Sequence, residues 1–271
     1  MPELPEVETT RRGIAPHVSD QIVTAVAVRE ARLRIPVPGD IAARVVGQRI
    51  ATVRRRGKYL QLDLERDALL IHLGMSGSLR IEPAATPPGR HDHVDIVMGT
   101  QTLRYRDPRR FGLVTWFAPQ DGPPAQYRNL GIEPLEGAFD GRWLHLATRT
   151  LRTPIKLFLM DTHRIVGVGN IYASESLFRA RIHPATPAGK LGPARCERLA
   201  AAVRETLEEA IRAGGSTLRD FVGGDGRAGY FQHSHAVYGR ADAPCPVCGG
   251  PVRRSVMGQR ATYHCPACQR R

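Results

Sequence analysis

Four cysteines near the C-terminus have the spacing that most clearly indicates chemistry. They form two Cys-x2-Cys pairs, separated by 16 residues, at Cys245, Cys248, Cys265 and Cys268. Two such pairs can bring four thiolates to one tetrahedral point, which suits Zn²⁺. The alternatives are two disulfides or four thiols without a ligand, and a reducing compartment disfavours the disulfides. We therefore expect one structural zinc ion in a zinc ribbon, with a β-hairpin between the two pairs.

The amino terminus offers a second reactive group. Methionine is normally removed before proline, and removal of Met1 makes Pro2 a secondary α-amine. An α-amine titrates near pH ~8, well below a lysine at about 10.4, so part of it is neutral and nucleophilic at neutral pH. Such an amine could attack a sugar C1′ and form an iminium. From these residues alone, the commoner interpretation is a proline that starts a helix, with Glu3 and Glu6 as partners of the helix dipole.

The elements that carry these groups follow from hydrophobic periodicity. Residues 3–17 have the pattern of a helix. Short β runs follow at 22–28, 58–64, 68–73, 93–98 and 112–117, separated by Gly and Pro. The run 58–64 alternates with period two, as a half-buried strand does. This pattern predicts a β-sandwich or barrel with one helix at its N-terminus.

The second half of the chain has a helical pattern. Residues 118–124 have linker composition, and helices are predicted at 142–150, 170–179 and 193–213, the last ended by two glycines. Cys196 lies on the apolar stripe of that last helix, which favours core packing. We expect an N-terminal domain at 1–118, a linker at 119–131, a helical domain at 132–235 and the ribbon at 236–271.

Composition narrows the classes of function. The chain has 271 residues, of which 39 are Lys or Arg and 26 Asp or Glu, so its formal net charge is +13. This excess indicates a polyanionic partner, nucleic acid first and an acidic membrane surface second. Apolar residues make up 42 %, which excludes a wholly disordered chain. No apolar stretch approaches the roughly 20 residues that span a bilayer, and the N-terminus does not resemble a signal peptide.

A series of segments along the chain resembles one family. They run in order as Pro2–Glu8, Arg56–Tyr59, His72–Gly77, Asp107–Gly112, Val168–Glu175, Asp225–Phe231 and Val237–Arg240, followed by the four cysteines. Together they resemble bacterial formamidopyrimidine-DNA glycosylase, a repair enzyme for oxidised purines. The related endonuclease-eight branch usually has glycine where this chain has Leu4, which favours the purine-repair branch.

The resemblance implies a set of catalytic residues. It makes Pro2 the Schiff-base nucleophile, which reverses the interpretation from the residues alone. It gives Glu3 an acid/base role and Glu6 a supporting one. It places Lys58 at the lesion's phosphate, where it assists β-elimination, and gives Arg260 on the ribbon hairpin a part in δ-elimination.

The resemblance also implies DNA contacts. Met75, Arg109 and Phe111 fill the space left by the extruded base, with Phe111 as a wedge and Arg109 facing an orphaned cytosine. Phosphate contacts are expected from His91, Arg152, Lys156 and Asn170, in addition to Arg260. Asn170 also fits physically because it opens a helix, whose N-terminus favours an anion. Residues 223–229 match the family's lesion-capping loop.

The resemblance implies an α+β fold: an N-terminal β-sandwich with a catalytic N-terminal helix, a helical domain with a helix–two-turns–helix motif, and a C-terminal zinc ribbon. It implies a bifunctional glycosylase and abasic-site lyase that acts on duplex DNA containing oxidised purines or abasic sites. We expect a monomer that is cytoplasmic, nucleoid-associated and without a membrane partner. The rival interpretation is a non-catalytic zinc-ribbon DNA-binding protein. It accounts for the charge and the ribbon but not for the N-terminal segment or Lys58.

Overall fold

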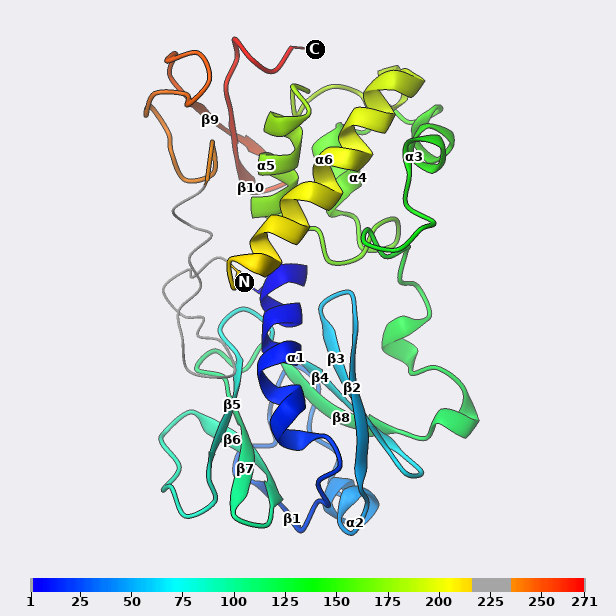
Figure 1. Ribbon diagram of the computed structural model, residues 1–271, viewed down its shortest axis with the longest axis vertical. Helices are drawn as coiled ribbons and strands as arrows, with labels where there is room; N and C mark the ends of the chain where they lie inside the picture. The colour runs from blue at the N-terminus through cyan, green and yellow to red at the C-terminus, as the bar shows by residue number, and fades with distance from the viewer. Residues whose placement is uncertain (1, 216–234, 271) are drawn as a thin grey trace. The chain divides into compact units, whose positions relative to one another are not determined.

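The computed structural model describes residues 2–215 and 235–270 (Figure 1). These residues fall into two compact units, one of 2–128 with 213–215 and one of 129–212 with 235–270. The domain boundaries expected from the sequence stay predictions. The 223–229 loop and Met1 lie outside the described residues. No helix among the residues described is long and apolar enough to cross a membrane.

The first unit contains two four-stranded antiparallel sheets. One has the order β1-β6-β7-β5, from β1 (Ala25–Val28), β5 (Ser78–Pro83), β6 (Asp92–Met98) and β7 (Gln101–Arg106). The other has the order β2-β3-β4-β8, from β2 (Ile50–Arg56), β3 (Tyr59–Leu64), β4 (Ala68–His72) and β8 (Leu113–Phe117). Two separate sheets make this a sandwich rather than a barrel, which confirms the expected fold.

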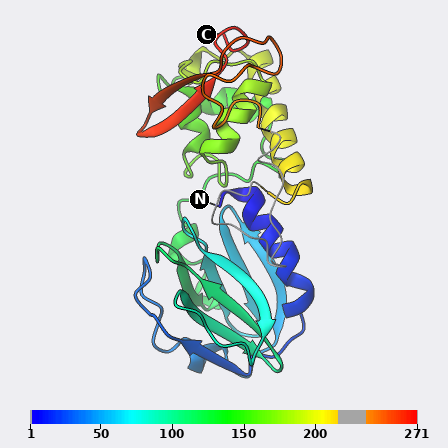
Figure 2. The same ribbon diagram turned by 90° about the vertical axis from the view of Figure 1, so that its left-hand side faces the viewer.

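Helix α1 (Leu4–Val18) packs against both sheets of the sandwich. It contacts β2 and β3 of one sheet and β5 of the other, and it lies alongside the sandwich in both views (Figures 1 and 2). Its apolar face is fully buried at Val7, Ile14 and Val18. These side chains join the sandwich core, so burial of apolar area holds the start of the helix in place. A short helix, α2 (Ile41–Val45), also packs on this unit.

The second unit is helical apart from its ribbon. It contains α3 (Gly141–Thr148), α4 (Ile155–Met160), α5 (Asn170–Arg179) and α6 (Pro193–Arg212), and α6 packs against α3 and α5. Cys196 is fully buried on α6, as its place on the apolar stripe predicts. Helix α4 and the turns over 161–169 precede α5, which gives the helix–two-turns–helix motif. Short 3₁₀ turns lie at Pro119–Asp121, Ala125–Tyr127 and Ala188–Lys190.

The ribbon is a two-stranded hairpin, β9 (Arg253–Met257) and β10 (Arg260–His264). Gly258 and Gln259 connect the strands with φ of 53° and 59°. Two positive φ values in a two-residue loop are typical of the type I′ turn, whose twist matches that of paired strands. Strand β10 contacts α5, so the hairpin is attached to the helical part of its own unit.

Candidate functional site

The start of α1 places three predicted catalytic residues together. Pro2, Glu3 and Glu6 are all buried, with Glu3 3 % and Glu6 2 % exposed. The backbone N–H of Glu3 donates to Glu6 Oε2 at 2.8 Å, and the two residues form a reciprocal capping box. Gly215 has a φ of +81°, and a Cβ there would lie 3.1 Å from Glu6 Oε1. The two carboxylates are therefore fixed by the helix terminus that they cap.

Glu8, one turn further along α1, has a different role. Its carboxylate accepts hydrogen bonds from Arg11 and Arg12 of the same helix and from Arg55 of β2. Burial alone would raise the pKa of Glu8, but the hydrogen bonds from Arg11 and Arg12 outweigh it and lower the pKa. Glu8 thus stays ionised and fastens α1 to β2, which keeps the start of the helix in register with the sheet.

Lys58 lies in the turn between β2 and β3, beside His72 at the end of β4. Tyr59 is paired in register with His72, and their ring centroids are 4.8 Å apart. Burial lowers the pKa of His72 to about 4, with further lowering by the charges of Lys58 and Arg34. The N–H of Gly74 donates to His72 Nδ1 at 2.9 Å, which requires that nitrogen to be unprotonated.

Sequence reasoning assigned no role to His72. Its signal was present, because it opens the His72–Gly77 segment that carries the resemblance. Burial, with the charges of Lys58 and Arg34 nearby, lowers the pKa of His72 and favours its neutral form.

Met75, Arg109 and Phe111 lie on two loops that touch. Gly74 has a φ of +63°, and a Cβ there would lie 2.5 Å from the backbone carbon of Phe111. Only glycine allows this approach of the two backbones. Phe111 is 45 % exposed, and the Arg109 guanidinium carbon lies 4.8 Å from its ring centroid. The structure therefore brings the three expected void-filling residues onto one pair of loops, with a large apolar ring facing solvent.

His91 lies just before β6, on a loop held by a buried arginine. Arg104 is 3 % exposed and donates to Asp95 and Glu82 and to the backbone oxygens of Thr86 and Pro87. This network fixes the loop that leads to His91, which is itself partly exposed. Among the residues that the structure describes, the four cysteines form the group of three or more side chains that could hold a metal ion, and His91 is not part of it.

In the second unit, Lys156 and Asn170 meet at the ribbon hairpin. Lys156 is fully buried, and its Nζ donates to Ala261 O at 3.1 Å and to Thr262 Oγ1 at 2.7 Å. Asn170, the first residue of α5, donates from Nδ2 to the same Ala261 O at 3.0 Å. Lys156 was expected to contact a phosphate. That expectation stays a prediction, and the structure shows the ammonium bonded to the backbone and side chain of β10.

Arg260 and Arg152 are exposed, as phosphate contacts require. Arg260 opens β10, next to the Ala261 carbonyl that Lys156 and Asn170 hold. Gly258 in the hairpin turn packs on α4, where a Cβ would lie 2.7 Å from Leu157 Cδ2. The position of Arg260 thus depends on contacts from α4 and α5.

The four ribbon sulfurs form one cluster. All lie within 4.8 Å of one another, with Cys248 and Cys265 at 3.5 Å and Cys245 and Cys268 at 3.9 Å. A tetrahedron with Zn–S bonds of about 2.3 Å needs sulfurs about 3.8 Å apart. A disulfide needs about 2.05 Å, so the thiols are unpaired. The cluster fits one structural zinc ion.

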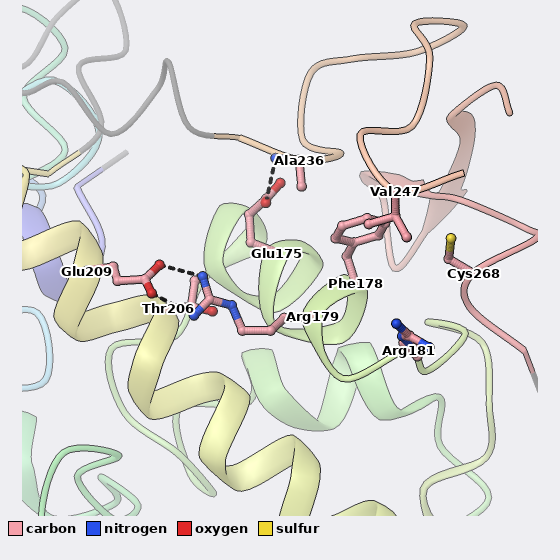
Figure 3. A pocket seen from close by; sticks show the side chains of 9 residues that line it. All are labelled: Glu175, Phe178, Arg179, Arg181, Thr206, Glu209, Ala236, Val247 and Cys268. Atoms are coloured by element: carbon pink, nitrogen blue, oxygen red, sulfur yellow. Dashed lines mark hydrogen bonds and ion pairs between the residues drawn. The ribbon is translucent and has the colours of Figure 1, made fainter. Parts of the chain in front are cut away.

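A cavity of about 290 Å³ lies in the second unit (Figure 3). It is lined from α5 and α6 by Phe178, Arg179 and Glu209, and from the ribbon side by Val247 and Cys268. Arg179 is already paired with Glu209 and with Glu205. The cavity contains none of the expected catalytic residues, so it does not compete with the start of α1 as an active site.

Three family profiles match successive parts of the chain. They are the formamidopyrimidine-DNA glycosylase N-terminal domain over 1–114, the H2TH domain of the same enzymes over 130–222, and a zinc finger found in FPG and IleRS over 243–271. A formamidopyrimidine-DNA glycosylase of Aromatoleum aromaticum is 63 % identical over 271 residues, covering 100 % of both chains. One from Alkalilimnicola ehrlichii is 55 % identical, also over 100 % of both.

Solved structures show the same likeness. The MutM (Fpg) protein of Thermus thermophilus has a TM-score of 0.87 and 42 % identity, covering 99 % of this chain and 98 % of that one. A Lactococcus lactis Fpg variant in complex with DNA containing Fapy-dG has a TM-score of 0.92 and 30 % identity, covering 100 % of both. A complex of the Lactococcus lactis Fpg with abasic-site DNA also has a TM-score of 0.92, at 30 % identity, and covers 99 % of this chain.

Proposed function

Since the chain belongs to the formamidopyrimidine-DNA glycosylase family, we propose that it is a bifunctional DNA glycosylase and abasic-site lyase of base excision repair. Its substrates are oxidised purines in duplex DNA, such as 8-oxoguanine opposite cytosine and formamidopyrimidines. The observation that carries this proposal is the start of α1, where Pro2 is buried beside the fixed carboxylates Glu3 and Glu6. A protein that only binds DNA has no need to bury two carboxylates at its N-terminus, since an isolated buried charge is costly.

The reaction starts at Pro2. After removal of Met1, the proline nitrogen attacks C1′ of the damaged nucleotide; the N–C1′ bond forms, and the bond to the base breaks. The departing base takes up a proton, and Glu3 exchanges protons with the sugar oxygen or the base. Protonation of O4′ then lets the C1′–O4′ bond break, which opens the sugar and leaves an iminium between C1′ and the Pro2 nitrogen. The iminium acidifies the C2′ protons, so β-elimination breaks the bond to the 3′ phosphate and δ-elimination then releases the 5′ phosphate.

The other site residues support these steps. Glu6 holds Glu3 through the capping box, and Lys58 places a cation at the lesion's phosphate during β-elimination. Arg260 contacts phosphate from the hairpin and assists δ-elimination. His72 stays neutral beside Lys58, so it adds no further charge to the site.

DNA binding uses residues of both units. Met75, Arg109 and Phe111 fill the gap in the stack, which offsets part of the few kcal/mol that extrusion of a base costs. His91, Arg152, Asn170 and Arg260 contact phosphates. Lys156, also expected at a phosphate, holds the Ala261 carbonyl next to Arg260. The zinc ion, bound by the four cysteines, supplies folding energy to the ribbon and takes no part in the chemistry. The enzyme works as a cytoplasmic monomer at the nucleoid, where its substrate lies.

Borohydride trapping tests this function. A duplex with one 8-oxoguanine is incubated with the enzyme and sodium borohydride, and the product ends are identified in a parallel reaction without reductant. We expect a covalent protein–DNA adduct mapped by peptide mass to Pro2, and strand ends that carry phosphate on both sides of the gap. A glycosylase that uses water forms no reducible iminium. Binding without incision or adduct supports the zinc-ribbon alternative, and an adduct mapped to Lys58 reassigns the nucleophile.

A further inference from the structure

Asp107, at the end of β7, is fully buried, and four hydrogen bonds surround its carboxylate. Oδ1 accepts from Ser76 Oγ at 2.8 Å and from the Arg109 N–H at 3.2 Å. Oδ2 accepts from the Gly112 N–H at 2.9 Å and from the Tyr105 hydroxyl at 3.2 Å. A buried carboxylate is tolerated when its oxygens are saturated in this way, so the arrangement is held tightly.

Three of these four donors come from the two loops that carry the void-filling side chains, and the fourth, Tyr105, lies on β7. Ser76 directly follows Met75, and Gly112 directly follows Phe111. The third donor is the backbone N–H of Arg109 itself. One carboxylate therefore contacts the loop of each of the three side chains, although Ser76 and Asp107 lie 31 positions apart in the sequence.

The backbone of Asp107 is fixed as well. Its carbonyl oxygen accepts from His93 Nε2 at 2.8 Å, which ties the loop to β6, and from the Arg110 N–H at 3.2 Å. On the other side, Gly74 and the Phe111 backbone are so close that a single Cβ would clash. Because the two loops are in such close contact, a movement of one also moves the other. Loss of the hydrogen bonds to the carboxylate therefore displaces both loops.

We propose that Asp107 is a positioning residue for base extrusion, which holds the loops of Met75, Arg109 and Phe111 as one rigid wedge. This inference rests on the proposed function. Unstacking a base costs a few kcal/mol, and a wedge can supply that energy only if its support does not yield. A preformed abasic site has no base to unstack, so Asp107 matters much less there.

The test is Asp107→Asn. The amide has the same shape but turns one acceptor oxygen into a donor that faces two other donors. We expect single-turnover excision of 8-oxoguanine to fall about tenfold, the factor that about 1.4 kcal/mol represents. Cleavage and borohydride trapping at a preformed abasic site should stay within about threefold of the parent enzyme. Equal losses on both substrates would falsify the inference.

Asp67→Asn is the matched control. Asp67 is also buried, at 5 % exposed, and accepts from Gln48 Nε2 at 2.7 Å. It precedes β4, at the opposite end of that strand from the loop of Met75. This variant is expected to leave the ratio of excision to abasic cleavage unchanged. A similar fall of the ratio in Asp67→Asn contradicts the inference, because general loss of stability then explains it.

A double-mutant cycle with Phe111→Ala shows whether Asp107 acts through the wedge. If it does, the double variant is little worse at excision than Phe111→Ala alone. If the fold loss of excision in the double variant equals the product of the losses in the two single variants, the inference is wrong. If Asp107→Asn does not fold, Ser76→Ala is tested in its place, because it removes one of the four hydrogen bonds to the carboxylate. It should lower excision of 8-oxoguanine about threefold and leave cleavage of the abasic site nearly unchanged. If the parent enzyme itself forms no adduct, the proposed function fails, and not the role of Asp107.

Discussion

The two units hold their functional side chains in opposite ways. In the first, the carboxylates assigned to chemistry are buried, and neighbouring backbone groups fix them, as at Glu3 and Glu6. In the second, the assigned cation Arg260 is exposed at the hairpin turn, and the groups that fix it are buried beneath, as Lys156 is. Acid/base and nucleophilic groups gain from a desolvated setting, whereas a phosphate contact must reach the DNA. We therefore expect catalysis and DNA binding to be lost through different substitutions.

The largest difference between loss of catalysis and loss of DNA binding should come from one residue added before Pro2. The added residue converts the proline amine into an amide, which cannot form an iminium. We expect borohydride trapping to fall at least 100-fold, beyond what loss of one binding contact explains. Affinity for an abasic duplex, measured by anisotropy, should change less than about threefold, since phosphate contacts dominate it. Abundant adduct from the extended chain contradicts the Pro2 assignment.

Loss of zinc should weaken DNA binding while the catalytic unit stays folded. In Cys248→Ala, or after extraction with a strong chelator, the ribbon loses the ion that organises it. We expect affinity for duplex DNA to fall tenfold or more, because Arg260 is no longer held. Near-ultraviolet spectra and limited proteolysis should show the sandwich still folded. Metal analysis comes first, and active protein without about one zinc per chain argues against this scheme.

Lys156→Met tests the buried support of Arg260. Methionine fills similar space but leaves Thr262 Oγ1 without its ammonium donor. We expect about 1.5–3 kcal/mol of destabilisation in urea unfolding, the range for a hydrogen bond to a charged group. Lys190→Met, at an exposed position, is the control and should change stability by less than about 0.5 kcal/mol. A salt slope of binding that drops by about one charge in Lys156→Met, with stability unchanged, instead indicates direct phosphate contact.

At neutral pH the smallest effect is that of His72, whose contribution to stability appears only as the pH falls. Its pKa is lowered to about 4 in the folded chain, from an ordinary value near ~6.5. The unfolded chain therefore binds the extra proton first as the pH falls, and stability decreases between pH ~6.5 and ~4. The slope from this group is at most about 1.4 kcal/mol per pH unit. His72→Gln should flatten the curve of unfolding free energy against pH in that window. An unchanged curve contradicts the buried, neutral state of His72.

Much of the architecture could be predicted from local pattern. The helices predicted at 3–17, 170–179 and 193–213 correspond to α1, α5 and α6, with ends that differ by at most a residue. Strands β2, β5 and β7 were missed. Strand β2 ends in three arginines, and β7 alternates Arg104 and Arg106 with apolar residues. Arg104 is buried there because Asp95 and Glu82 neutralise it, and such partners from other strands leave no local signal.

The site was predictable where one segment contains both the group and its support. Pro2, Glu3 and Glu6 share one helix start, and the cysteine spacing by itself indicates zinc. It was not predictable where the support comes from far away in sequence. Lys156 finds its acceptors about 105 residues later, at Ala261 and Thr262, so its buried position could not be inferred from its charge.

The capping box at Glu3 and Glu6 bears on the choice of an inactive enzyme for crystallising a substrate complex. Truncating either side chain to alanine removes a cap worth about 1 kcal/mol and lets the first turn fray, so the bound lesion would be seen against a distorted nucleophile. Glutamine keeps an oxygen that accepts the same backbone N–H bonds while it abolishes proton transfer. Glu3→Gln is therefore the substitution that should capture an uncleaved oxidised purine with Pro2 in its native place.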